Sequence, residues 1–179
     1  VSAVTDLRTQ GATSFVFDFR QNPGGLLDQA LKISNMFLDD GDVIMQTKEK
    51  DAEPNKIVAS DSEFGDFKIT EPSVLLVDEG SASASEIVAG ALQESSEIPL
   101  VGTTTFGKGT VQTVYPLTES SELKLTVAKW LTPNGNWIHQ KGIAVDYEVA
   151  LPEYATLTII DSTATYEEGT VSEEVKNVE

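Results

Sequence analysis

The run from Gly80 to Glu86, GSASASE, places small and hydroxyl-bearing residues between two apolar stretches. Residues 74–77 are typical of a buried strand, and residues 87–92 are typical of the first turns of a packed helix. Ser83 would then stand at a helix start, where unpartnered backbone N–H groups can bind a developing negative charge. This arrangement suits a serine nucleophile. The same residues also fit a capping box, in which Ser83 begins the helix and Glu86 bonds back to it.

A lysine between two glycines, Lys108 in Gly107-Lys108-Gly109, offers a base for such a serine. Lysine is ordinarily charged in water, so a basic lysine must be kept neutral by burial away from carboxylates. Residues 98–118 contain no acidic residue, although the whole chain has 29. Gln112 lies four positions after the lysine, and in an extended segment it would share one face with Lys108 and accept a hydrogen bond from its amine. A solvated loop lysine and an ordinary strand glutamine are the alternatives.

Composition restricts the other chemistries. The chain has no cysteine, which excludes a cysteine nucleophile, and its one histidine disfavours a zinc site. We therefore expect no metal and no cofactor. His139 is the rival base; it follows a turn at residues 133–136 and is typical of a surface hairpin arm. A net charge of -17 repels phosphates and disfavours nucleic-acid binding.

A second turn, Asn22-Pro23-Gly24-Gly25, follows an apolar stretch and precedes a helical pattern. Paired glycines can direct their amides unusually, because glycine tolerates backbone angles closed to other residues. The amide of Gly24 or Gly25 could thus join the amide of Ala84 in an oxyanion hole. The alternative is a tight strand-to-helix connection.

The elements that must position these residues alternate along the first hundred residues, which favours an α/β fold. We expect strands at 14–19, 43–45, 73–78 and 98–103, and helices at 26–38 and 84–95. Residues 48–63 are polar and predict an exposed loop or hairpin. From Thr110 onward the pattern is mostly β, with strands at 111–115 and 123–128. We expect a core over residues 1–155 and a tail or linker over 156–179.

Four stretches together resemble the C-terminal processing peptidases, or tail-specific proteases. They are DFRQNPGGLL from Asp18, VDEGSASASEI from Val77, GTTTFGKGTVQ from Gly102 and LTPNG from Leu131. They follow one another in the family's order across residues 5–150. One departure is Val145 before Asp146, where the family often has proline; we expect a structural role for this position.

The resemblance implies an α/β core related to the crotonase and Clp protease folds, and a serine endopeptidase that cleaves protein substrates near their C-terminal tails. It implies Ser83 as nucleophile, Lys108 as general base and Gln112 as its support. It also implies oxyanion donors at Ala84 and at Gly24 or Gly25. A catalytically silent peptide-binding or scaffold domain and a crotonase-like acyl-thioester enzyme remain the alternatives.

Further expectations concern the full-length protein. No PDZ-like segment is recognised in the chain, so we expect that domain to precede it. Residues 171–178 resemble the start of a peptidoglycan-binding module, which would link the protein to the cell wall. The family also implies a location outside the cytoplasm at the bacterial cell envelope, and allows a homodimer of the full-length protein.

Overall fold

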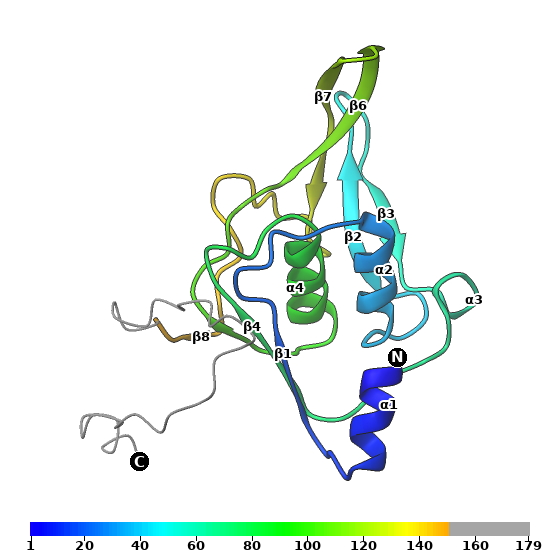
Figure 1. Ribbon diagram of the computed structural model, residues 1–179, viewed down its shortest axis with the longest axis vertical. Helices are drawn as coiled ribbons and strands as arrows, with labels where there is room; N and C mark the ends of the chain where they lie inside the picture. The colour runs from blue at the N-terminus through cyan, green and yellow to red at the C-terminus, as the bar shows by residue number, and fades with distance from the viewer. Residues whose placement is uncertain (151–179) are drawn as a thin grey trace.

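A parallel sheet and an antiparallel sheet enclose a buried helix in the computed structural model, which describes residues 1–150 (Figure 1). The expected mixed α/β class is therefore confirmed. The expected tail or linker over 156–179 lies outside the described residues, as does the stretch resembling a peptidoglycan-binding module. Within residues 1–150, no helix has the length and apolar character needed to cross a membrane.

The parallel sheet brings the candidate residues to one edge. Its strands are β1 (Phe15–Asp18), β4 (Ser73–Val77), β5 (Leu100–Gly102) and β8 (Tyr147–Glu148), in the order β1-β4-β5-β8. Leu75, Val77 and Leu100 are fully buried in it. Parallel strands end at the same edge of their sheet, where such folds gather their binding loops. The segments after β1, β4 and β5 therefore meet there.

The antiparallel sheet ends in a projecting hairpin. It contains β2 (Val43–Lys48), β3 (Asn55–Val58), β6 (Thr110–Thr118) and β7 (Ser121–Leu131), in the order β3-β2-β7-β6. The hairpin of β6 and β7 extends beyond the helices at one end of the molecule, and α1 (Ser2–Thr9) lies at the other (Figure 1).

The central helix is α4 (Ala84–Ser95), whose residues 84–92 are all buried. A helix that is small and apolar all round can be enclosed on every side. Against it packs α2 (Leu27–Asn35), and the short α3 (Asp61–Phe64) follows β3.

The predicted elements agree well with the observed ones. The bounds of α4 match the expected helix, and the remaining predicted strands and the other helix are shifted or resized at their ends. The structure adds α1, and it resolves the polar stretch 48–63 into the end of β2, β3 and α3. Asp146 is structural as expected: its carboxylate accepts hydrogen bonds from the Leu100 N–H at 2.8 Å and the Gln93 side chain at 3.1 Å.

Candidate active site

Ser83 stands at the sharp turn between β4 and α4. Its φ of 58° and ψ of -116° are rare for a residue with a side chain, and such strained conformations cluster at functional sites. Glu86 bonds back to this residue as the capping box predicts, its carboxylate accepting from the Ser83 N–H at 2.8 Å. The capping and nucleophile interpretations are therefore compatible, because the cap uses the backbone that holds the serine in its turn.

Gly24 packs directly against the serine turn. It has a φ of 91°, and a Cβ at this position would lie 2.5 Å from the Ala82 carbonyl oxygen and 2.7 Å from the Ala84 nitrogen. Only glycine fits such a contact. The Gly24 N–H donates to the Asn22 side-chain oxygen at 3.0 Å. A Cβ added at Gly25 would meet no atom within 4 Å, and the Gly25 N–H donates no hydrogen bond within residues 1–150.

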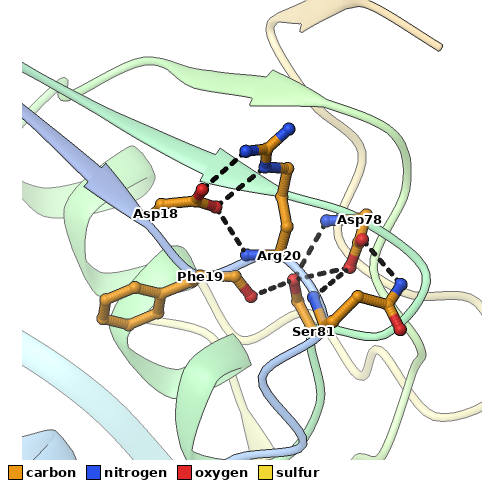
Figure 2. Close-up of polar contacts among 6 residues, drawn as sticks. Asp18, Phe19, Arg20, Asp78 and Ser81 are labelled. Atoms are coloured by element: carbon orange, nitrogen blue, oxygen red, sulfur yellow. Dashed lines mark hydrogen bonds and ion pairs between the residues drawn. The ribbon is translucent and has the colours of Figure 1, made fainter. Parts of the chain in front are cut away.

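Asp78 joins the glycine turn after β1, residues 21–25, to the serine turn between β4 and α4 (Figure 2). This buried carboxylate accepts hydrogen bonds from the Gln21 N–H and side-chain amide, both at 2.8 Å, and from the Gly80 N–H at 2.9 Å. The Ser81 hydroxyl donates to the Phe19 carbonyl at 2.7 Å. Burial opposes ionisation of Asp78, but these hydrogen bonds outweigh it and lower the pKa of the carboxyl. The two turns that carry the candidate oxyanion donors are thus held together.

Glu86 fastens the serine turn to the lysine segment. Glu86 is fully buried, and its carboxylate accepts hydrogen bonds from the Thr105 hydroxyl and the Gly107 N–H, both at 2.6 Å. It also accepts from the Lys108 N–H at 2.9 Å. One carboxylate therefore binds the backbone of both Ser83 and Lys108. The sequence indicated only the capping role of Glu86. A charged residue among the apolar residues of this helix was the one signal in the sequence that Glu86 has further hydrogen-bond partners.

The carbonyl groups of the lysine segment are held from the opposite side. The indole of Trp130 donates to the Lys108 carbonyl at 2.7 Å, and the indole of Trp137 donates to the Gly109 carbonyl at 2.9 Å. The Gln140 N–H donates to the Gly107 carbonyl at 2.8 Å. The backbone that presents Lys108 is thus fixed by partners on both sides.

The backbones of Ser83 and Lys108 share the Glu86 carboxylate, but within residues 1–150 their side chains do not contact each other through a hydrogen bond. Ser83 and Lys108 are both half-buried, and no hydrogen bond joins their side chains in the described part of the chain. Lys108 lines an open depression of about 490 Å³ together with Pro23, Gly80 and Ala82. The depression lies beside the serine turn, on the side of Ala82.

Gln112 does not share a face with Lys108, although its spacing from the lysine predicts that it would. Gln112 is exposed on β6, and it has no hydrogen bond to Lys108 among residues 1–150. The lysine precedes β6, and the strand register shifts between Val111 and Gln112. A bulge of this kind interrupts the alternation of side chains, so a spacing of four does not ensure a shared face.

His139 lies in a segment without strands, residues 132–146, so its interpretation as a hairpin arm is wrong. It is half-buried, and its ring stacks on that of Trp137 with 5.4 Å between centroids. Among the described residues its Nδ1 has no hydrogen-bond partner. No hydrogen bond joins it to Ser83 there.

Known proteins are similar to this chain over most of its length. The chain is 47% identical to the carboxy-terminal processing protease CtpA of Bacillus subtilis over 174 residues, which is 97% of this chain and 36% of that protein. It is 40% identical to a probable CtpA-like serine protease of Staphylococcus epidermidis over 177 residues, 99% of this chain and 36% of that protein. The chain thus spans about a third of the length of these relatives.

Solved structures show the same relationship. The photosystem II D1 C-terminal processing protease superposes with a TM-score of 0.73 and 34% identity over 83% of this chain and 38% of that chain. A putative S41 protease from Bacteroides fragilis shares the fold, with a TM-score of 0.68 and 20% identity over 83% of this chain and 41% of that one. The sequence model described as peptidase family S41 matches residues 1–149. The chain therefore belongs to peptidase family S41.

Proposed function

We propose that this chain is the catalytic core of a serine endopeptidase of the C-terminal processing type, with Ser83 as nucleophile and Lys108 as general base. The observation that carries the proposal is the Glu86 carboxylate, which binds the N–H groups of both residues. A buried acceptor shared in this way fixes the two turns relative to each other. Relatives whose names describe carboxy-terminal processing support the same activity.

Acylation would begin with the neutral amine of Lys108. The amine takes the proton of the Ser83 hydroxyl while the serine oxygen attacks the peptide carbonyl carbon. The carbonyl oxygen then carries the negative charge of the tetrahedral intermediate. As the C–N bond breaks, the Lys108 ammonium gives its proton to the leaving amine, and the acyl group remains on Ser83 as an ester.

Deacylation would use the same base. Lys108 takes a proton from water as the water oxygen attacks the ester carbonyl, and then returns a proton to the departing Ser83 oxygen. The products are a new carboxyl terminus and a free serine. The side chains of Ser83 and Lys108 must approach each other for these steps. The Gln112 amide oxygen would orient the Lys108 amine once the amine is close to Ser83.

For the oxyanion we propose the amides of Ala84 and Gly25. The Gly24 amide is engaged by Asn22, whereas the Gly25 amide donates no hydrogen bond within residues 1–150. Preorganised donors of this type stabilise a charge that develops only during reaction, and losing one costs roughly 3–4 kcal/mol of barrier. The turn at Gly24 lies close to the Ala84 nitrogen, since a Cβ at Gly24 would be only 2.7 Å from it.

The substrates we propose are proteins with accessible C-terminal tails, cut outside the cytoplasm. The test uses the full-length protein with Ser83→Ala, Lys108→Ala and, as a control, the exposed Lys141→Ala. We expect the first two to abolish peptide cleavage and the third to leave it unchanged. A small fluorophosphonate should label Ser83 in the unmodified protein. Unchanged cleavage in Ser83→Ala would refute Ser83 as the nucleophile. No cleavage by the unmodified protein, together with no labelling of Ser83, would favour a silent binding domain instead.

A further inference from the structure

We propose that the open depression beside Lys108 binds the leaving residue of the substrate, the residue whose amine departs when the peptide bond breaks. Phe106 packs against the side chain of the leaving residue and favours apolar groups, and Glu79 disfavours acidic ones. This inference rests on the proposed function, because it assigns a role to the space beside the proposed base.

The work of the general base decides which half of the substrate lies in this depression. As the peptide bond breaks, Lys108 must give a proton to the departing amine, so its ammonium lies within hydrogen-bond reach of that nitrogen. The carbon that bears the side chain of the leaving residue is bonded directly to the same nitrogen. The depression that Lys108 lines is therefore the space nearest to this side chain.

The depression combines apolar and charged residues around a volume of about 490 Å³. Its apolar lining residues are Pro23, Ala82 and Phe106, and its charged ones are Glu79 and Lys108. The other two, Gln21 and Gly80, belong to the turns that Asp78 holds together. An apolar side chain is thus partly covered here, whereas a charged side chain meets charged neighbours.

Phe106 presents an exposed ring from a fixed backbone. Its N–H donates to the Ser81 carbonyl at 3.0 Å, and the adjoining Thr105 and Gly107 both donate to the Glu86 carboxylate at 2.6 Å. Phe106 itself is nevertheless 63% exposed. Covering apolar surface that is already held in place gains hydrophobic stabilisation with little further loss of backbone freedom. An aromatic leaving residue gains further from packing against the ring.

Glu79 supplies the negative charge of the depression. Its exposed carboxylate accepts a hydrogen bond from the Thr103 hydroxyl at 3.2 Å, and no ion pair joins it to Lys108 within residues 1–150. When Lys108 is neutral, as the proposed mechanism requires, Glu79 is the only charged residue that lines the depression. Like charges repel, so a leaving residue with a carboxylate is disfavoured, and salt should screen this repulsion.

The test uses the full-length protein and internally quenched peptides that differ only in the leaving residue. We expect kcat/KM to be about tenfold higher for phenylalanine or leucine than for alanine, because more apolar surface is covered. It should be about threefold lower for aspartate than for asparagine, which has nearly the same shape without the charge. Added salt should narrow the second ratio more than the first. Product masses identify the bond that is cut.

Two variants locate these preferences in the depression. Phe106→Ala should reduce the phenylalanine-to-alanine ratio about fivefold, and Phe106→Tyr should preserve it because the ring is kept. Tyr147→Ala is the matched control, since Tyr147 is also 63% exposed but lies outside the depression. Glu79→Gln should make the rates for aspartate and asparagine nearly equal. Glu122→Gln, which removes an exposed carboxylate from the projecting hairpin, should leave their ratio unchanged.

The outcomes separate this inference from the proposed function. If the small fluorophosphonate does not label Ser83 and no peptide is cut, the proposed function is overturned, and the assignment of the depression with it. Labelling and cleavage, combined with preferences that Phe106→Ala and Glu79→Gln leave unchanged, would overturn the assignment of the depression alone. Equal effects of Phe106→Ala and Tyr147→Ala on the phenylalanine-to-alanine ratio would do the same.

Discussion

The turns at the edge of the parallel sheet and the hairpin of β6 and β7 hold different parts of the candidate site, and they are stabilised very differently. Buried Asp78 and Glu86 join the turns through hydrogen bonds of 2.6–2.9 Å. The hairpin that carries Gln112 projects from the molecule (Figure 1). The backbone around Ser83 and Lys108 is therefore preorganised within this chain, whereas the support for the lysine amine is not.

The hairpin also leaves apolar side chains in solvent. On one face, exposed residues alternate along both strands: Tyr115, Leu117, Leu123, Leu125 and Val127. A two-stranded hairpin without a packed face is marginally stable in water. We therefore expect changes in the turns to remove activity through geometry, and changes in the hairpin to act on the amine alone.

Among changes that keep both Ser83 and Lys108, the largest effect should come from Gly24→Ala. The new methyl group would lie 2.5 Å from the Ala82 carbonyl oxygen and must displace the serine turn. We expect kcat/KM for peptide cleavage to fall by about 1000-fold, the loss associated with disturbing an oxyanion site. In Gly25→Ala the methyl group meets open space and the amide is kept, so kcat/KM should fall less than about 100-fold, a tenth of the loss expected for Gly24→Ala. Equal losses in both variants would refute the close-contact explanation.

Glu86→Gln should reduce turnover by about 100-fold, equivalent to about 2.7 kcal/mol of barrier. The amide nitrogen would face N–H and O–H donors that now share the carboxylate. Glu94→Gln is the matched control, because Glu94 lies in the same helix and accepts hydrogen bonds from Thr132, Asn134 and Asn136. Both variants should melt at lower temperature, but only Glu86→Gln should lose turnover. A comparable loss in Glu94→Gln would reduce the effect to general destabilisation.

Changes at Gln112 test the hairpin side of the comparison. Gln112→Ala should lower kcat about tenfold, the size of one lost hydrogen bond to the reacting group, without a change in melting temperature. Gln112→Glu should lower it further, because a carboxylate beside the amine keeps Lys108 charged. Its activity should then recover at higher pH. A pH–rate profile identical to that of the unmodified protein would show that Gln112 does not approach the amine.

The smallest effect should come from Asp78→Asn. The pKa of Asp78 is lowered in the folded protein, so the native state binds fewer protons than the unfolded state near this pKa. The stabilisation is complete above the ordinary value of 3.8 and is lost as the pH falls through the lowered folded value. The variant should therefore lose about 1 kcal/mol of unfolding free energy at pH 7. Denaturant titrations should show that the difference in unfolding free energy between the two proteins shrinks as the pH falls below 3.8, the ordinary pKa of aspartate. A difference that does not depend on pH would contradict the explanation.

Much of the fold could be predicted from local patterns. The small-residue run before an apolar helix indicated the turn at Ser83, and the bounds of α4 followed from its composition. The role of Asp78, and the role of Glu86 beyond its capping of the helix, could not be predicted, because Gln21 and the later partners of Glu86 come from segments far along the chain. For Glu86 these are Thr105, Gly107 and Lys108, about twenty residues away. Long-range partners of this kind leave no periodicity in the sequence.

The prediction for Gln112 shows a different limit. Its spacing from Lys108 assumed an uninterrupted strand, and the register shift before Gln112 depends on the pairing of β6 with β7. Similarly, His139 was assigned to a hairpin because of the turn before it, whereas the stacking on Trp137 is a tertiary contact. Local turn signals specify where the chain reverses, but they do not specify what the following residues meet.

The indole contacts with the lysine segment give this protein an internal optical reporter. The chain contains two tryptophans, and both donate hydrogen bonds to the carbonyl groups of Lys108 and Gly109. Trp130 is almost wholly shielded from solvent, and Trp137 is 38% exposed. A shift of the Lys108–Gly109 backbone that carries the amine toward the serine would strain or break these bonds. Intrinsic emission could therefore follow the assembly of the site in real time, without an attached dye.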